Sequence, residues 1–331
     1  MLIEYGCRRV STLGIMTICQ DARAHQGLAD SESEPRPMTF DLADYGIKYD
    51  EFGNVFVMAN GKGGVGKTTL TANAAAKTAR MGLPSLVIDV NGQGNMHRDL
   101  GYGERDQGAA FAESMTKGAP LVPLTGVREN LDVIVGGPEV RKINGVITDV
   151  ARNEGFMDAY LRMAVCLAPL LPRYKAVFID TPPENPDLLR LCLLAARYAV
   201  VPVKYDAASL DDGLKDFGQA FKMAVQVNRQ LRILGVAHCF SQRNSTQIHK
   251  EIVKRSQGIL GKHAYVFPRA VGHSSTMAGL IRDRGRTAFE LEQERLAGSK
   301  GIPDSAQPLA EDYEVLVTQI FQRAAELRKA A

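Results

Sequence analysis

Residues 55–69 read Val-Phe-Val-Met-Ala-Asn-Gly-Lys-Gly-Gly-Val-Gly-Lys-Thr-Thr. An apolar run ends at a glycine-rich loop, and the loop leads into a segment rich in Ala, Thr and Leu. The pattern G-x-x-x-x-G-K-[ST] is met by Gly61, Gly66, Lys67 and Thr68, so this order predicts a strand, a phosphate-binding loop and a helix. Glycines let backbone N–H groups turn toward a phosphate, and the helix N-terminus adds positive potential. We therefore predict a nucleoside triphosphate site.

The loop residues have separate expected roles. Lys67 can reach the terminal phosphates, and the hydroxyl of Thr68 can be a ligand of Mg²⁺. The nucleotide is expected to contact the whole loop: Gly61, Lys62, Gly63, Gly64, Val65, Gly66, Lys67, Thr68 and Thr69.

Two other apolar runs end in an aspartate. Asp89 ends the run that begins at Ser85, and Asp180 ends the run that begins at Ala176. A carboxylate at a strand end near the loop can hold Mg²⁺, so Thr68, Asp89 and Asp180 form the predicted magnesium site. Thr181-Pro182-Pro183 follows Asp180. The two prolines stiffen that turn, which is typical of a segment that senses the γ-phosphate.

Short apolar runs alternate with segments of helical spacing along most of the chain. The expected strands are 55–59, 85–89, 131–135, 176–180, 199–203, 231–240 and 264–267, and the expected helices are 68–81, 109–115, 155–171, 188–197, 210–227, 247–259 and 311–329. This alternation predicts an α/β fold: a doubly wound, mostly parallel sheet flanked by helices. We expect one domain over residues 38–331.

The first 37 residues differ from the rest of the chain. Residues 20–37 are polar and without periodicity, so we expect residues 1–37 to be a flexible leader or an over-long gene start. Of 331 residues, 45% are apolar and 23% charged, as in soluble globular proteins, and a net charge of +3 is too small to indicate a partner. Five cysteines without paired spacing are expected to be reduced thiols rather than a metal site or a disulfide framework.

The helix expected at 311–329 has one apolar face, which carries Tyr313, Leu316, Ile320 and Phe321. Its other face mixes acidic and basic side chains, whereas a helix on a membrane surface would be basic there. We expect this helix to pack against the body of the protein. A contact with a partner and attachment to a membrane remain the alternatives.

A second lysine, Lys62, lies inside the loop in the sequence Lys-Gly-Gly-Val-Gly-Lys-Thr-Thr. With this lysine the chain resembles the ParA/MinD family of deviant Walker A ATPases, and the ParA branch most closely. The resemblance implies a P-loop NTPase fold with ATP and Mg²⁺ as cofactors. It also implies that Lys62 reaches across an ATP-sandwich homodimer to the nucleotide of the partner subunit.

The segment Asp89-Val90-Asn91-Gly92-Gln93-Gly94-Asn95 resembles the family pattern Asp-x-Asp-Pro-Gln-Gly-Asn, with Asn91 in place of the second Asp. In the family that Asp orients or activates the attacking water, and an amide cannot accept the proton. We therefore predict weak ATP hydrolysis that depends on a partner. By resemblance the catalytic residues are Lys62, Lys67, Asp89 and Asn91. The residues of the switch are Gln93, Thr181, Pro182 and Pro183.

The window from Ser245 to Arg286 has a net charge of +6, with eight basic and two acidic side chains. Such segregation favours contact with phosphates, and ParA-type proteins bind DNA non-specifically as ATP dimers. The expected DNA-binding residues are Lys250, Lys254, Arg255, Arg282, Arg284 and Arg286. The resemblance further implies plasmid or chromosome partition, a ParB-like partner and a cytoplasmic, nucleoid-associated location. We expect no membrane partner.

Three alternatives remain open. The first is a MinD-like ATPase that positions partners at a membrane or a cell pole. The second is a metabolic or electron-transfer relative, whose iron–sulfur form needs a cysteine pair that bridges two subunits. Here Cys166 and Cys192 fall in predicted helices instead. The third is a nucleotide-binding adaptor with little hydrolysis, which only Asn91 supports.

Overall fold

The computed structural model describes residues 42–103, 106–240 and 246–329. The expected leader, residues 1–37, lies outside this part of the chain. Within it the strands are β1 (Val55–Met58), β2 (Ser85–Asp89), β3 (Leu124–Arg128), β4 (Leu131–Ile134), β5 (Ala176–Asp180), β6 (Tyr198–Val203) and β7 (Arg232–His238).

The α-helices are α2 (Lys67–Arg80), α3 (Met96–Leu100), α4 (Ala109–Lys117), α5 (Ile143–Asn153), α6 (Phe156–Leu167), α7 (Pro186–Leu194), α8 (Ala207–Val227), α9 (Thr246–Leu260), α10 (Ser275–Arg284), α11 (Ala288–Leu296) and α12 (Ala306–Lys329). The 3₁₀ turns are η1 (Leu42–Tyr45), η2 (Tyr49–Phe52), η3 (Pro138–Lys142) and η4 (Ala168–Arg173).

The strands form a seven-stranded sheet over the described residues, in the order β3-β4-β2-β5-β1-β6-β7. Every neighbouring pair is parallel except β3 with β4. Strand β1 lies inside the sheet, between β5 and β6, so the loop that follows it emerges away from both edge strands. The carboxyl ends of β1, β2 and β5 meet at one edge, which is where ligands bind in open α/β sheets. The predicted fold class is confirmed.

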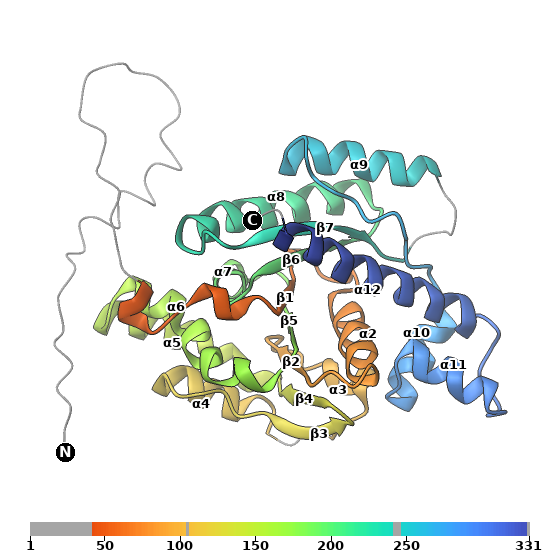
Figure 1. Ribbon diagram of the computed structural model, residues 1–331, viewed down its shortest axis with the longest axis horizontal. Helices are drawn as coiled ribbons and strands as arrows, with labels where there is room; N and C mark the ends of the chain where they lie inside the picture. Colours follow the sequence, from red (N-terminus) through yellow and green to blue (C-terminus); the bar gives the residue numbers. More distant parts are fainter. Residues whose placement is uncertain (1–41, 104–105, 241–245, 330–331) are drawn as a thin grey trace.

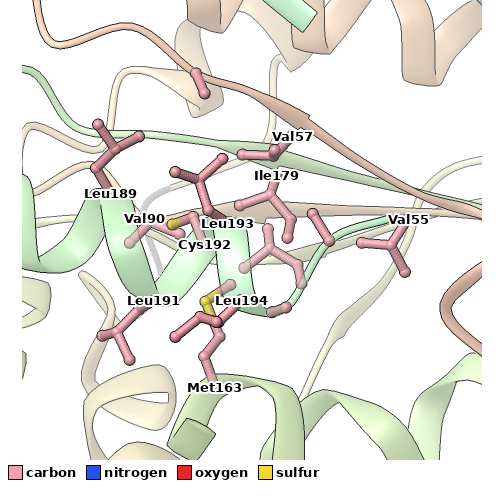
Figure 2. Close-up of a cluster of buried hydrophobic side chains, with 14 of the residues drawn as sticks. Val55, Val57, Val90, Met163, Ile179, Leu189, Leu191, Cys192, Leu193 and Leu194 are labelled. Atoms are coloured by element: carbon pink, nitrogen blue, oxygen red, sulfur yellow. The ribbon is translucent and has the colours of Figure 1, made fainter. Parts of the chain in front are cut away.

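Helices cover both faces of the sheet (Figure 1), and each face has its own hydrophobic core. Val55 and Val57 of β1 pack toward α4 to α8, whereas Phe56 and Met58 pack toward α2, α3 and α10 to α12. This alternation follows from the period of two in a strand, with both faces covered. Figure 2 shows Val57 beside the leucines of α7, with Cys192 among them. The buried Cys166 and Cys192 lie in α6 and α7, as predicted.

The C-terminal helix packs against the body, as the sequence favours. It begins five residues earlier than expected, at Ala306, and its apolar face contributes Tyr313, Leu316 and Ile320 to the core beside α2. Lys77 of α2 also donates a hydrogen bond to the carbonyl of Glu314, at 2.8 Å. Within the described ranges, the structure has no helix that is long and apolar enough to cross a membrane.

One predicted strand is wrong. Residues 264–267 do not form a strand; a single parallel bridge joins Val266 to Val236 of β7. The N–H of Phe267 donates to the carbonyl of Val236, but the N–H that donates to the carbonyl of His238 belongs to Val271, so the backbone does not stay in register with β7. The structure adds β3, α3, α5, α10 and α11, which the sequence patterns do not indicate.

Candidate nucleotide-binding site

The predicted phosphate loop joins β1 to α2. The side chain of Asn60 anchors its start, because its amide nitrogen donates to the carbonyl of Pro202 at 2.7 Å and its oxygen accepts from the N–H of Lys62 at 2.8 Å. Gly64 and Gly66 have φ values of 70° and 92°, which glycine adopts without strain. The chain can therefore turn tightly and present the N-terminus of α2 at the sheet edge.

Lys67, the first residue of α2, extends back into the loop. Its ammonium donates a hydrogen bond to the carbonyl oxygen of Lys62 at 2.6 Å. Burial lowers the pKa of Lys67 to about 8, while the nearby carboxylates of Asp180 and Glu184 act in the opposite direction. A desolvated ammonium in this loop can pair with phosphate oxygens, and the low local dielectric strengthens that attraction.

Thr68, Asp89 and Asp180 come together, as the sequence predicts. The hydroxyl of Thr68 donates to Oδ2 of Asp180 at 2.6 Å, and Asp89 pairs with Asp180 in the register of β2 and β5. Both carboxyl groups are fully buried. Burial raises the pKa of Asp89, and the charge of Asp180 adds to that effect; burial also raises the pKa of Asp180, opposed by its bond from Thr68.

These residues fit a hydrated Mg²⁺ ion. Oδ2 of Asp89 and Oδ1 of Asp180 are buried and lack a hydrogen-bond partner among the described residues. Buried carboxylate oxygens require compensation, and a divalent cation supplies it. Over the same residues, no group of three or more His, Cys, Asp or Glu side chains is arranged to hold a metal ion. Mg²⁺ takes most of its ligands from water and phosphates.

Asn91 lies directly after β2 beside Asp89. Its N–H donates to Oδ1 of Asp89 at 3.0 Å, and its side-chain oxygen accepts from the N–H of Gln93 at 2.9 Å. This second bond closes a turn that an aspartate at residue 91 would also close. The side chain of Asn91 therefore maintains the local fold of the segment. A cavity of about 230 Å³ is lined by Asn91, Gln93, Pro182 and Pro183. The amide of Asn91 cannot accept a proton there.

The predicted switch segment contacts the loop. The hydroxyl of Thr181 donates to the carbonyl of Met58, at 2.8 Å, and the N–H of Glu184 donates to the carbonyl of Gly61, at 2.8 Å. A Cβ atom at Gly63 would lie 3.6 Å from Cβ of Pro183. The segment after β5 is thus bonded to β1 and to the loop that follows it.

Lys62 and α8 form the outer wall of the loop. The ammonium of Lys62 lies 3.9 Å from Oδ2 of Asp212, and the Lys62 side chain is partly exposed. Gly61 is pressed against Asp216, because a Cβ atom at Gly61 would lie 2.8 Å from Cβ of Asp216. Sequence reasoning missed these neighbours, since residues more than 140 positions away give no local signal.

A third buried aspartate, Asp99, was also missed. It lies in the short helix α3, where burial raises the pKa of its carboxyl group. In the sequence, Asp99 lies in a glycine-rich stretch. It neither ends a predicted strand nor belongs to a known motif, so the sequence did not indicate it as a site residue.

The six expected DNA-binding residues fall into two separate groups. Lys250, Lys254 and Arg255 lie on α9, whereas Arg282 and Arg284 lie on α10 with Arg286 just after it, and the two helices are well apart in Figure 1.

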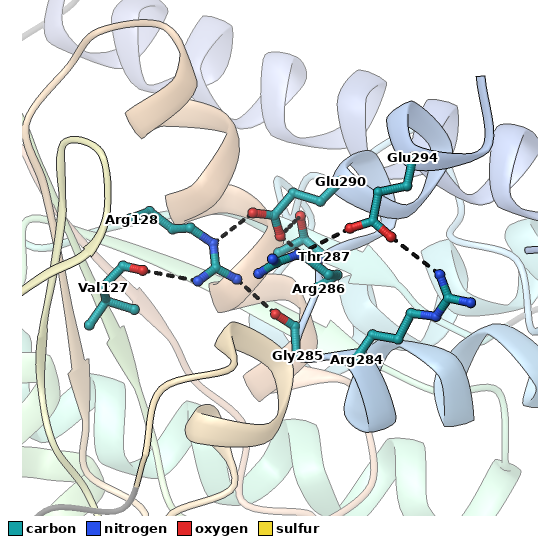
Figure 3. Close-up of polar contacts among 8 residues, drawn as sticks. All are labelled: Val127, Arg128, Arg284, Gly285, Arg286, Thr287, Glu290 and Glu294. Carbon is teal, nitrogen blue, oxygen red and sulfur yellow. Dashed lines mark hydrogen bonds and ion pairs between the residues drawn. The ribbon is translucent and has the colours of Figure 1, made fainter. Parts of the chain in front are cut away.

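Three of these six residues are paired with acidic side chains. Arg255 bonds Asp211 at 3.0 Å and Glu251 at 2.8 Å. Figure 3 shows Arg284 and Arg286 on either side of Glu294, at 3.3 and 3.1 Å. The excess positive charge of the sequence window is therefore reduced in the folded protein.

Comparisons with known proteins agree with this geometry. The family model described as "AAA domain" matches residues 53–233, more than half of the chain. The chromosome partitioning protein ParA of Myxococcus xanthus is 25% identical over 224 residues, which cover 66% of this chain and 76% of that protein.

Two solved structures show the same fold. The pNOB8 ParA structure has a TM-score of 0.63 at 19% identity, covering 82% of this chain and 99% of that one. Cobyrinic acid a,c-diamide synthase from Mycobacterium smegmatis, solved with a bound ATP analogue and magnesium, has a TM-score of 0.58 at 20% identity, covering 76% and 98%.

Proposed function

The chain belongs to the AAA-domain family, with ParA-type partition proteins among its relatives, and from this premise we propose that it is a ParA-like partition ATPase. The observation that carries the proposal is the bond from Thr68 to Asp180 beside Asp89, at the mouth of a loop that contains Lys62 and Lys67. This constellation combines a phosphate cradle with a site for a hydrated cation. The proposed cofactors are ATP and Mg²⁺.

ATP occupancy is proposed to drive dimerisation. Lys62 is partly exposed on the loop and paired with an exposed carboxylate, so it can turn toward a nucleotide held by a second subunit. The segment after Asp180 is bonded to Gly61 and Met58, and it would respond to the γ-phosphate by changing those bonds. ADP lacks that phosphate and would not support the same dimer.

Hydrolysis is proposed to be slow and stimulated by a ParB-like partner. Lys67 would stabilise the charge that develops on the transferred phosphoryl group, and Mg²⁺ held by Thr68, Asp89 and Asp180 would supply further positive charge there. Asn91 would orient the attacking water through its amide without taking its proton. Positioning and charge still lower the barrier, so the reaction continues at a reduced rate.

The dimer is proposed to bind DNA non-specifically in a nucleoid-associated, cytoplasmic location and to serve plasmid or chromosome partition. The exposed Lys250 and Lys254 lie four residues apart on α9, and Arg282 is exposed on α10. Such surfaces contact phosphates rather than bases. A MinD-like role at a membrane is less favoured, because the apolar face of α12 is buried against the sheet.

A gel-shift series tests this function. Binding of a mixed-sequence duplex is measured with Mg²⁺ and either ATP or ADP, over rising salt, for the native chain and for Lys67→Ala. We expect binding with ATP that weakens steeply with salt and is lost in Lys67→Ala. Binding that ignores both salt and nucleotide would overturn the proposed function.

A further inference from the structure

An arginine lies over the turn that carries Asn91. The side chain of Arg141, in η3, crosses Gly92: a Cβ atom at Gly92 would lie 2.9 Å from Cγ of Arg141 and 3.2 Å from its Nε. The ParA pattern has a proline at this place in the sequence, whereas this chain has glycine. A proline ring would collide with the arginine, so the position of Arg141 depends on Gly92.

The guanidinium of Arg141 is available to a ligand. Among the residues that the structure describes, it forms no ion pair, whereas the neighbouring Lys142 is paired with Glu139. An aspartate at residue 91 would bring a carboxylate to the cavity that Arg141 lines, and a guanidinium pairs readily with a carboxylate. With Asn91 in that place, the turn under Arg141 offers it no negative charge.

Two amide side chains add hydrogen-bond donors. Asn91 and Asn144 line the same cavity as Arg141. The side-chain oxygen of Asn91 accepts from the N–H of Gln93 at 2.9 Å, and that of Asn144 accepts from the side-chain nitrogen of Asn185 at 3.2 Å. Each amide therefore has its NH₂ group left to donate to a ligand. A guanidinium and two amide NH₂ groups together suit a phosphate anion.

The predicted switch joins this cavity to the phosphate loop. Pro182 and Pro183 line the cavity, and a Cβ atom at Gly63 of the loop would lie 3.6 Å from Cβ of Pro183. A phosphate that moves from the loop past Pro183 would reach the cavity beside Arg141. One acidic side chain, Glu184, also lines the cavity and opposes an anion there. Arg141 offsets that charge, and the amide donors then favour the anion.

We propose that Arg141, Asn91 and Asn144 form a binding site for inorganic phosphate, which would hold the phosphate released by hydrolysis beside Pro182 and Pro183. This inference rests on the proposed ATPase function. Arg141 supplies the positive charge, and the two amides orient the phosphate oxygens. While phosphate stays in this site it lies against the switch, so the switch would respond to the release of phosphate as well as to its cleavage from ATP.

Phosphate affinity is measured with the loop already filled. Each chain is saturated with Mg²⁺ and ADP, and inorganic phosphate is added at constant ionic strength. The rise in Tm with phosphate concentration gives an apparent Kd. Arg141→Gln should raise this Kd about tenfold, because a charge-assisted hydrogen bond is lost. Glu184→Gln should lower it roughly threefold, because the charge that opposes the anion is removed.

Lys142→Gln is the matched control. It removes the same charge one residue further along, from a side chain that does not line the cavity, so its Kd for phosphate should equal that of the native chain. Equal Kd values in the native chain and in Arg141→Gln would overturn the inference. An equal loss in Lys142→Gln and Arg141→Gln would also overturn it, because net charge alone would then be responsible.

A second titration separates the source of the phosphate. The affinity of Arg141→Gln for a non-hydrolysable ATP analogue should equal that of the native chain. A loss of affinity for the analogue, with an unchanged Kd for phosphate, would assign Arg141 to the nucleotide in the loop and overturn the inference. If the native chain binds neither ADP nor the analogue, the proposed function fails. Phosphate added to the nucleotide-free Lys67→Ala chain, with and without Arg141→Gln, then still tests the site.

Discussion

The ammonium of Lys62 lies 3.9 Å from the carboxylate of Asp212, a residue 150 positions further along the same chain. The Asp212 side chain is 58% exposed, and exposed ion pairs of this kind contribute only about 0.5 kcal/mol to stability. In the proposed dimer, a phosphate bound to the second subunit would therefore replace Asp212 as the partner of Lys62. In the isolated chain this lysine lies against α8.

The packing of α8 on the loop predicts that Gly213→Ala damages the site. A Cβ atom at Gly213 would lie 2.5 Å from Oδ1 of Asn60, the atom that accepts from the N–H of Lys62. Relief of this clash requires the loop to move, so we expect a loss of about 1–3 kcal/mol in the free energy of unfolding and weaker ATP binding. Denaturant unfolding and nucleotide titration measure the two effects.

Gly218→Ala is the matched control in the same helix. Its Cβ atom would lie 3.4 Å from Cδ2 of Leu260, a contact that a small adjustment accommodates. Because alanine has a higher helix propensity than glycine, the free energy of unfolding of this variant should rise by up to about 1 kcal/mol. Its affinity for ATP should equal that of the native chain. If both variants lost stability and ATP affinity to the same extent, the clash with Asn60 would not be the cause of the losses in Gly213→Ala.

Asn91→Asp should raise steady-state ATP turnover. It supplies a carboxylate that can accept a proton from water, and general-base catalysis contributes about 100-fold or more where it operates. Multiple-turnover phosphate release, with and without DNA, is the measurement.

Asn95→Asp adds the same charge four residues further along, on a side chain that bonds Gln93 at 2.9 Å. Turnover in this variant should stay at the native level. If Asn91→Asp brings no gain over the native chain, residue 91 does not limit hydrolysis.

Glu294→Gln should strengthen DNA binding. Glu294 neutralises Arg284 and Arg286 (Figure 3), and a neutral amide would leave both guanidinium groups available to phosphates. We expect affinity in low salt to rise about threefold, with a steeper dependence on salt concentration. Glu292→Gln, whose partner on the same helix is Arg295 at 2.8 Å, should leave DNA affinity unchanged. A similar gain in both variants would mean that net charge alone is responsible.

Acid should destabilise the fold through His238. Burial lowers the pKa of His238 to about 4 from 6.5, with the charge of His249 acting in the same direction. Between these values the unfolded chain binds more protons than the folded chain, so stability falls as the pH drops below about 6.5. The loss from this residue alone amounts to roughly 2 kcal/mol at pH 5.

His238→Gln should therefore narrow the difference in Tm between pH 7 and pH 5, whereas His263→Gln, on an exposed side chain, should leave that difference unchanged. A pH dependence that persists unaltered in His238→Gln would contradict this assignment.

The sequence predicted the central sheet well, because buried parallel strands are apolar throughout. β3 escaped notice for the opposite reason: Leu124–Arg128 lies at the edge of the sheet, and its side chains are exposed or half-buried. α3 is only five residues long, too short for a periodic pattern. The strand predicted at 264–267 is apolar because Val266 and Phe267 are buried beside β7, although their backbone does not extend the sheet.

The site residues that could be predicted from the sequence are those at the end of a strand or in the loop that follows it. Asp89 and Asp180 could be placed together because the carboxyl ends of parallel strands meet at one edge. Asp99 lies on α3 and Asp212 on α8, and no local sequence pattern specifies how these two helices pack. The basic window was visible, but its pairing with Glu294 and Asp211 depends on tertiary contacts alone.

The central claim is that ATP, sensed through Lys62, joins two subunits. Size-exclusion chromatography with light scattering tests it on the native chain and on Lys62→Gln, with Mg²⁺ and either a non-hydrolysable ATP analogue or ADP. With the analogue, the native mass should rise from 36.0 kDa to twice that value, and with ADP it should not. Lys62→Gln should remain at the mass of one chain under both conditions. A native chain that stays monomeric with the analogue, or a Lys62→Gln variant that dimerises as readily as the native chain, would contradict the account.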